Sequence, residues 1–130
     1  MKKLLIITIV LLGMSMGANA QAIFSGSTSH SSYSSYFLSN TSGSPRACGN
    51  NSNGQLGDGT KTDRSMPVRV SGLSGVTAIS AGESHCLFLK KDSSVWSCGS
   101  NEDGQLGDGT DTDRLTPVKL SGLTGIIAIA

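Results

Sequence analysis

The sequence predicts an all-β fold made of repeated units, and three observations point to it. The heptapeptide GQLGDGT occurs twice, at Gly54–Thr60 and at Gly104–Thr110. Shifting the chain by fifty residues aligns 47–80 with 97–130 without a gap, and 21 of these 34 positions are identical. Glycine is abundant and no long amphipathic helical pattern occurs, which is typical of short strands joined by tight turns. A repeat of this length is a supersecondary unit that buries its apolar surface against its neighbours.

The first twenty residues have the features of a secretory signal peptide. Lys2 and Lys3 precede an apolar run, Leu4–Leu12, that is too short to span a bilayer. Small residues at 18–20 form the expected cleavage site, so we expect cleavage after Ala20. The protein is therefore expected to be exported, to the periplasm, cell surface or medium, with no membrane span after cleavage.

The charge balance argues against a nucleic-acid partner. The chain has ten Lys and Arg residues and nine Asp and Glu residues, and removing Lys2 and Lys3 with the leader leaves a net charge of −1. No basic stripe remains that could neutralise phosphates.

The residues after the leader divide into a loose segment and two repeats. Residues 21–34 are serine-rich and are expected to be loose. The repeat register lays Ser35–Leu38 over His85–Phe88, so 35–80 is interpreted as a first repeat with a degenerate start. Residues 81–130 are interpreted as a second repeat, cut short before the next unit is complete.

The second repeat shows its strands most clearly. Cys86–Leu89 and Val95–Cys98 are short apolar, β-prone runs that predict an antiparallel hairpin. After a loop rich in Gly, Asn and Asp, Thr116–Leu120 predicts a strand that tolerates proline at its start or at a sheet edge. Ile126–Ala130 predicts the opening of another strand. Four strands per period, with small residues at tight turns, are typical of a β-propeller blade.

This order of residues resembles the repeats of the regulator of chromosome condensation family. The resemblance covers about Tyr36–Ala130 and implies a seven-bladed type of propeller, of which this chain would hold about two blades. The residues that carry it are His85-x-Leu87-x-Leu89, Val95-Trp96, Gly99-x-Asn101, Gly104-Gln105-Leu106-Gly107 and Pro117, and the first unit repeats the pattern from Gly49 through Ile79.

The repeated heptapeptide is expected to be a structural loop rather than a ligand site. Its glycines would allow tight turns and close approach between blades, its leucines would fill the blade interface, and its glutamines would bond the loop backbone. The resemblance implies that His85 is a structural hydrogen-bonding group between blades. The loop residues concerned are Gly54, Gln55, Leu56, Gly57, Gly104, Gln105, Leu106 and Gly107.

No pattern for catalysis, a cofactor or a metal emerges. The acidic stretch Asp103–Asp113 does not follow the EF-hand order, so its aspartates are interpreted as solvated turn residues rather than calcium ligands. GDGTKT lacks the spacing of a phosphate-binding loop. Neither His30 nor His85 lies near a nucleophile motif, and the three cysteines have no zinc-site spacing. The sequence therefore predicts a protein that is not an enzyme and carries no cofactor.

The turn of the second hairpin decides which cysteines face each other. A type I turn at Lys91-Asp92 with Ser93 in the bulge position would set Cys86 opposite Cys98. Opposed Cβ atoms lie about 4.5–5.5 Å apart, close enough for a cross-strand disulfide after slight adjustment. A two-residue turn would instead set Cys98 opposite Leu87 and leave all three thiols reduced. Ser93 is not the glycine that best suits a bulge, so both registers stay open and we expect the bridged one.

The remaining cysteine has no partner in this scheme. Cys48 is expected opposite Tyr36 and should be a free thiol. Export through an oxidising compartment would permit the Cys86–Cys98 bond. Some repeats of the resembled family carry a similar pair, one position further into the hairpin from each end.

Two classes of function remain. The first is a secreted, non-catalytic propeller module that binds a protein through its loops, as some secreted bacterial relatives do. The second is a structural or surface-display segment of a larger envelope or adhesin-like protein, or a truncated gene product without independent function. Two blades without a ring expose apolar faces and strand edges, so self-association through open blade edges is also expected.

Overall fold

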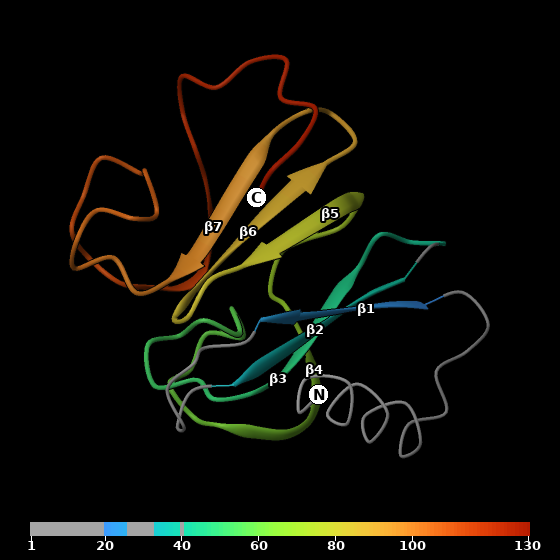
Figure 1. The fold of residues 1–130 in the computed structure, drawn as a ribbon, viewed down its shortest axis with the longest axis vertical. Helices are drawn as coiled ribbons and strands as arrows, with labels where there is room; N and C mark the ends of the chain where they lie inside the picture. The colour runs from blue at the N-terminus through green and yellow to red at the C-terminus, as the bar shows by residue number, and fades with distance from the viewer. Residues whose placement is uncertain (1–19, 26–32, 40) are drawn as a thin grey trace, which may run out of the picture.

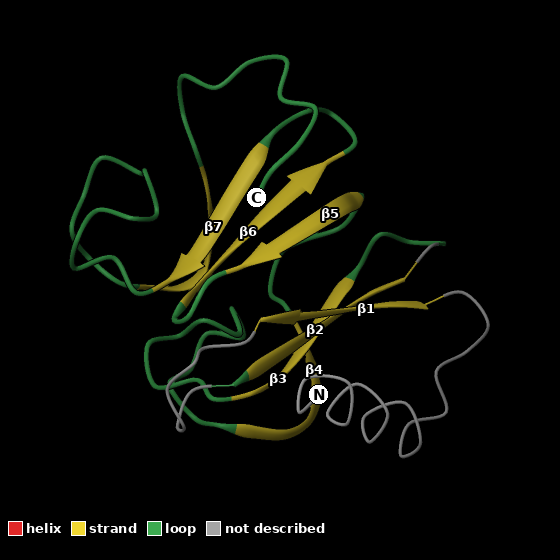
Figure 2. Ribbon diagram, in the orientation of Figure 1, coloured by secondary structure: helices red, strands yellow, loops and turns green. Residues whose placement is uncertain are grey.

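The computed structural model describes residues 20–25, 33–39 and 41–130. The residues of the expected leader other than Ala20 lie outside this range. Figure 2 shows that the described residues form strands and loops and no helix. The strands are β1 (Ala20–Ser25), β2 (Ser34–Ser39), β3 (Pro45–Gly49), β4 (Arg64–Arg69), β5 (Val76–Ala81), β6 (His85–Lys90), β7 (Val95–Gly99) and β8 (Arg114–Lys119).

The strands form two four-stranded antiparallel sheets. Each sheet is a meander, with the orders β1-β2-β3-β4 and β5-β6-β7-β8. Figure 1 shows the second sheet above the first, with β5 lying beside β1 and β2. Successive strands pair with their neighbours in both sheets, as in propeller blades, so the chain is all-β and forms two blades.

The expectation that residues 21–34 are loose is wrong at both ends of that segment. Residues 20–25 form β1 and pair with β2, from Ala20 opposite Ser39 to Ser25 opposite Ser34. Ser34 itself begins β2. The physical reason is that β2 would otherwise leave one edge of backbone N–H and C=O groups unpaired. Residues 26–32 lie outside the described part.

The boundary between the two blades differs from the predicted boundary between repeats. We expected the second repeat to begin at residue 81, but the second sheet begins with β5 at Val76. A sequence period gives the length of the unit and leaves its starting point undefined. The backbone pairing of β5 with β6 sets that starting point.

The register predicted for the second hairpin is confirmed. Cys86 lies opposite Cys98. Ser93 has a φ of 62°, and the N–H of Lys90 donates to the carbonyl of Ser94, which is the predicted turn with a bulge.

The register predicted for the first hairpin is wrong by one residue. We expected Tyr36 opposite Cys48, but Ser35 lies opposite Cys48 and Tyr36 opposite Ala47. The ungapped alignment begins at Ala47, so the weak match of Ser35–Leu38 to His85–Phe88 could not show that the two turns differ in length.

The expected strand at Ile126–Ala130 is absent from the structure. These residues belong to no strand, although their counterparts fifty residues earlier form β5. A strand requires a hydrogen-bonding partner, and no hairpin of the described residues pairs with this segment.

The main apolar core lies between the two sheets. It joins Leu56 and Leu73 of the first blade to Val76, Phe88 and others of the second. A smaller cluster of Leu89, Val95 and Leu120 lies on the other face of the second sheet, with Ile126 and Ile129 packed against it. The blades are therefore held together by their facing surfaces, and the second blade has the beginning of a further such surface.

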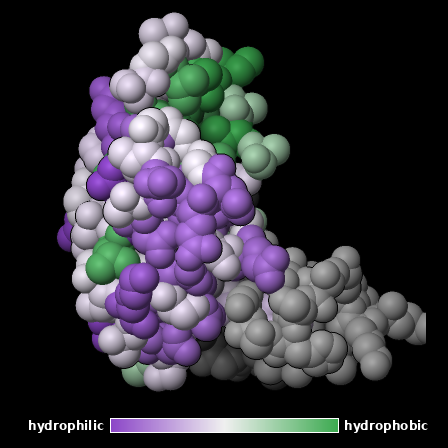
Figure 3. Space-filling view, turned by 90° about the vertical axis from the view of Figure 1, so that its left-hand side faces the viewer, coloured by the Kyte–Doolittle hydropathy of each residue, from purple (hydrophilic) through white to green (hydrophobic). Residues whose placement is uncertain are grey.

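The face of the molecule drawn in Figure 3 is mostly hydrophilic over its coloured residues. Figure 3 shows polar residues over the middle of the molecule and a hydrophobic area at its upper end, at the height of the C-terminal segment in Figure 1. Leu123 and Ile127 of that segment are among the exposed large hydrophobic residues. The described residues include no helix long and apolar enough to cross a membrane.

Candidate functional site: the interblade loops

Two long loops carry the repeated heptapeptide. The first loop, 50–63, joins β3 to β4, and the second loop, 100–113, joins β7 to β8. Each loop needs positive φ at several glycines, for example 66° at Gly57 and 70° at Gly107. Glycine adopts this conformation without the steric cost that a side chain would bring.

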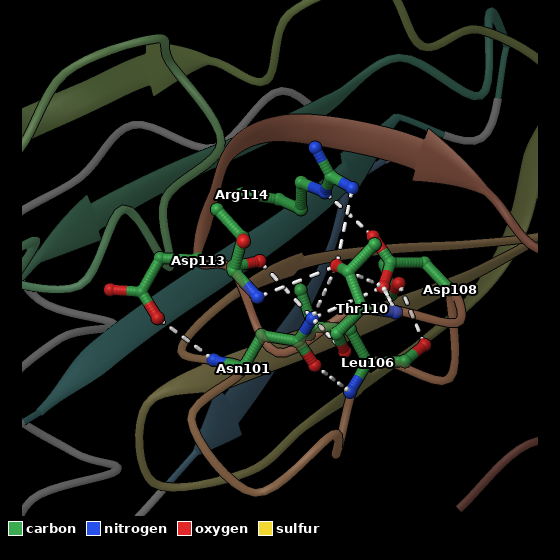
Figure 4. Close-up of polar contacts among 8 residues, drawn as sticks. Asn101, Leu106, Asp108, Thr110, Asp113 and Arg114 are labelled. Atoms are coloured by element: carbon green, nitrogen blue, oxygen red, sulfur yellow. Dashed lines mark hydrogen bonds and ion pairs between the residues drawn. The ribbon is translucent and has the colours of Figure 1, made fainter.

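A buried asparagine organises each loop. In the second loop the Asn101 side-chain amide donates to Asp108 Oδ1 at 3.1 Å, to the Thr110 carbonyl at 2.9 Å and to the Thr112 carbonyl at 3.1 Å. Its Oδ1 accepts from the Leu106 N–H at 3.0 Å. Figure 4 shows these contacts converging on one side chain. Asn51 makes the same set in the first loop.

Each loop is closed by an aspartate and an arginine. Arg114 Nε lies 2.6 Å from Asp108 Oδ2, and Arg64 Nε lies 2.7 Å from Asp58 Oδ2. Hydrogen bonds from Thr110 and Arg114 hold the pKa of Asp108 well below its usual range. Burial acts to raise the pKa of Asp58, but hydrogen bonds from Thr60 and Arg64 outweigh it and lower that pKa. Both carboxylates therefore stay charged and act as hydrogen-bond acceptors within the loop.

Sequence reasoning missed this network. The aspartates of Asp103–Asp113 were interpreted as solvated turn residues, but Asp113 accepts from the Asn101 N–H and Asp108 binds Arg114. Among the described residues, no three His, Cys, Asp or Glu side chains are grouped to hold a metal ion. The available signal was that these residues are identical in both loops at the same spacing.

The first loop also contacts the second blade directly. The Gly59 N–H donates to the Leu115 carbonyl at 2.9 Å, and Cys98 Sγ donates to the Gln55 carbonyl at 3.4 Å. Lys61 Nζ lies 3.3 Å from Asp113 Oδ2. Backbone, thiol and charged contacts thus join the first loop to the second blade.

The structural roles predicted for the heptapeptide residues agree with the geometry. The side-chain oxygens of Gln55 and Gln105 accept from backbone N–H groups two residues earlier, each at 2.9 Å. Leu56 and Leu106 are both buried, and Leu56 belongs to the core between the blades. A Cβ atom on Gly57 would lie 3.1 Å from Cys98 Sγ, so this glycine permits close approach of the second blade.

His85 does not make the hydrogen bond that the family resemblance implies. Among the described residues its imidazole has no hydrogen-bond partner; the ring instead covers Gly82, where a Cβ atom would clash with it. Burial lowers the pKa of His85, which favours the neutral ring. Its role in the structure is packing at the base of the hairpin.

The facing thiols of the second hairpin are unbridged in the structure. Cys86 and Cys98 are fully buried and free, and Cys48 is a free, partly buried thiol. Burial raises the pKa values of Cys86 and Cys98, so both remain protonated at neutral pH. A protonated, buried thiol is a poor nucleophile, so these residues form no reactive centre.

The family is established by comparison with known repeats. The chain matches the regulator of chromosome condensation (RCC1) repeat over residues 47–89 and 92–130, more than half of its length. The chain belongs to the RCC1 repeat family. A second description of the same RCC1 repeat matches residues 76–105. No match is found among curated proteins.

Solved structures of RCC1-type proteins share the fold. Human WBSCR16 is 33% identical with a TM-score of 0.59, over 68% of this chain and 24% of that protein. Prp20p from Saccharomyces cerevisiae, described with its binding properties to Gsp1p and histones, is 23% identical with a TM-score of 0.58, over 69% of this chain and 25% of that one. Yeast RCC1 (Prp20), bound to Kap60, is 23% identical with a TM-score of 0.66, over 90% of this chain and 26% of that one. The chain thus spans about a quarter of the length of these proteins.

Matched glycine substitutions should separate the cost of blade contact from that of the turn. Gly57→Ala and Gly107→Ala both place a side chain at positive φ, which costs about 1–2 kcal/mol. Only Gly57→Ala also pushes a methyl group against Cys98 and Pro117 of the second blade, and against the flexible end of Val70 in its own blade, where the Gly107 counterpart has room. Urea unfolding should show Gly57→Ala to be less stable than Gly107→Ala by about 1–3 kcal/mol. Equal losses would mean that the loops do not carry the blade contact.

The Cys86–Cys98 bond stays a prediction, now supported by the confirmed register. Because both thiols are buried when the RCC1 blades are packed, the bond would have to form before the blades close. Exported protein should be denatured and alkylated without reductant, then mapped by mass spectrometry. Cys48 should be alkylated and Cys86 and Cys98 protected. Alkylation of all three cysteines would refute the bridge.

Proposed function

We propose that this chain is an exported, non-catalytic RCC1-type module that binds another protein through the loops of its blades. The observation that supports this most is that the two loops share their internal hydrogen-bonding residues but differ at exposed positions. The buried asparagine, the glutamine and the Asp–Arg pair are identical in both copies, whereas other positions of the loop differ: the exposed Glu102 and Asp103 replace Ser52 and Asn53. A rigid frame with variable exposed positions is the arrangement expected of a binding loop.

The charge of the second loop indicates the chemistry of the partner. Glu102 and Asp103 are exposed and lie beside an internal network that already uses Asp108 and Asp113. Such a surface attracts basic groups and repels phosphates. Structures of Prp20 are described with protein partners, Gsp1p, histones and Kap60, which supports protein binding as the class of function.

Export is tested by the N-terminus of the mature protein. The full chain should be produced in a host with a secretory pathway, and the exported fraction should be analysed by intact mass. The expected species begins at Gln21, because the small residues at 18–20 suit signal peptidase. Protein found only inside the cell with residues 1–20 intact would contradict export.

Protein binding is tested by a loop exchange that keeps the frame. Glu102→Ser with Asp103→Asn gives the second loop the outward residues of the first. Wild-type and exchanged chains should be immobilised and exposed to exported proteins from the same source, with quantitative mass spectrometry of what is retained. A partner should be retained by the wild type and reduced at least about tenfold by the exchange, since charged contacts set specificity.

Thermal unfolding supplies the control for this exchange. The two side chains contribute nothing to the Asn101 network, so both chains should unfold at nearly the same temperature. Identical sets of retained proteins for the two chains, or no retained protein, would contradict binding through this loop and favour a structural segment of a larger envelope protein.

A further inference from the structure

Asn53 is the one asparagine of the sequence that is followed by a glycine, Gly54. The side-chain amide of such an asparagine can be lost in water, because the nitrogen of an unhindered glycine can attack the side-chain carbonyl carbon. The pair lies in the first loop, and the second loop has Asp103 and Gly104 at the same place. The two loops thus carry the amide and the acid form of one position.

The Asn53 side chain is arranged for this reaction. It is half-buried, and its Oδ1 accepts a hydrogen bond from the Ser52 hydroxyl at 3.1 Å. That bond stabilises the negative charge that develops on the oxygen when a nucleophile attacks the carbon. Among the described residues, the Nδ2 of Asn53 donates no hydrogen bond that would hold the leaving ammonia.

The backbone nitrogen of Gly54, in contrast, is restrained. Its N–H donates to the Asn51 carbonyl at 2.9 Å, and the Gly54 carbonyl accepts from the Gly57 N–H at 3.0 Å. Gly54 is buried against Leu115 of the second blade, where even a Cβ atom would clash. To attack the side chain, the nitrogen must lose its hydrogen bond and turn, which requires the loop to move away from Leu115. Contact with the second blade therefore protects Asn53.

The two products of the reaction differ in how they fit the loop. Aspartate would match Asp103, whose N–H donates to Gln105 Oε1 at 2.9 Å, as the N–H of Asn53 donates to Gln55 Oε1. Isoaspartate carries the main chain through the side-chain carbons and so lengthens it just before Gly54. The hydrogen bonds on both sides of Gly54 and its contact with the second blade leave no room for this longer linkage.

We propose that Asn53 is a deamidation site that becomes reactive only when the first loop separates from the second blade, and that the isoaspartyl product prevents the loop from packing back. The Gly54 nitrogen gives its proton to hydroxide and forms a bond to Asn53 Cγ, and the amide leaves as ammonia after taking a proton from water. Water then opens the succinimide ring at one of its two carbonyls, which gives aspartate or isoaspartate. The net reaction consumes water, releases ammonia and changes no oxidation state.

The modified chain is then a permanent record of separation of the blades. Each product adds a carboxylate to the first loop, and the isoaspartyl form also displaces Gly54 from its contact. The inference rests neither on the proposed export nor on the proposed binding through the loops, because the reaction needs only water.

Incubation of the purified chain at mildly alkaline pH, with and without guanidinium chloride, tests the protection. Peptide mapping by mass spectrometry gives the converted fraction of Asn53, and electron-transfer fragmentation separates aspartate from isoaspartate. Conversion should be at least about tenfold faster in denaturant, because a slow reaction of an opened segment follows the population of the open form. Equal rates in the two conditions, or no conversion in denaturant, would overturn the proposal.

Matched variants decide whether the second blade protects the site. Leu115→Ser removes the side chain over Gly54 and supplies the residue of the other repeat, Ser65. Val95→Ala weakens the apolar cluster on the other face of the second sheet. Compared at denaturant concentrations that give equal free energies of unfolding, Leu115→Ser should convert Asn53 at least about threefold faster. Equal rates would show that global unfolding exposes the site and would refute protection by the blade contact.

A further variant gives an internal reference without removing any blade contact. Asp103→Asn places the same dipeptide in the second loop, where the Gly104 N–H donates to the Asn101 carbonyl but no described atom lies within 4 Å of a Cβ atom on Gly104. In the folded protein this position should convert faster than Asn53 of the same molecule. A slower or equal rate would contradict the protection.

Thermal unfolding tests the fit of the products. Asn53→Asp should melt like the wild type, because Asp103 occupies the same loop frame. The deamidated pool, separated by anion exchange, should melt in two steps, and the share of the lower step should equal its isoaspartyl content. A single transition at the temperature of the wild type would show that isoaspartate does not prevent packing.

Discussion

Every part of this structure depends on the packing of one blade face against the next blade. A four-stranded sheet has two faces, and the main core is formed where the faces of two blades meet. Burying a large apolar side chain contributes about 1.5–3 kcal/mol, so Leu56, Leu73 and Phe88 together outweigh any single exposed ion pair at the rim. The stability of each blade is therefore tied to its neighbour, as in other repeat proteins.

The hydrogen-bond network within each loop fixes the loop in one conformation, and so fixes how the loop packs. Asn51 and Asn101 are fully buried polar residues, and the side-chain amide of each donates hydrogen bonds to backbone carbonyl and carboxylate groups of its own loop. No buried side-chain polar atom among the described residues lacks a hydrogen-bond partner. Leaving one such group unpaired would cost about 1–3 kcal/mol, so the loop has one favoured shape. That shape sets Gly57 and Leu56 against the neighbouring blade.

The fold was largely predictable because its signals are local or repeated. The hairpin register followed from the turn at Lys91-Asp92, and the period followed from GQLGDGT. The sequence did not reveal β1, because Ala20–Ser25 forms a strand only by pairing with β2. Ile126–Ala130 is not a strand for the converse reason: its pattern matches β5, but no strand of the described residues pairs with it.

The loop site was harder to predict than the fold. Its residues were visible as identities between the repeats, but Asp, Asn and Thr in a glycine-rich loop are equally typical of solvated turns. What distinguishes the two cases is burial: Asn101 is fully buried, and only tertiary structure shows that. His85 illustrates the opposite error, because a family position implied a hydrogen bond where the ring instead packs over Gly82.

Because the blades are repeats of one another, something must distinguish the correct neighbouring blade from a wrong one. The positions that can do so lie at the blade rim, the exposed edge of the contact between blades. Because the apolar and loop positions are nearly the same in both copies, they hold any blade of this type and cannot encode the order of blades. Order must come from positions that differ between copies and face a neighbour: Lys61 and Leu115 each contact the other blade, and their counterparts in the repeat are Asp111 and Ser65. A like charge at such a contact costs little stability within a folded chain but acts against every wrong neighbour. The exposed rim, which contributes least to holding the blades together, is thus the place where neighbours can be distinguished.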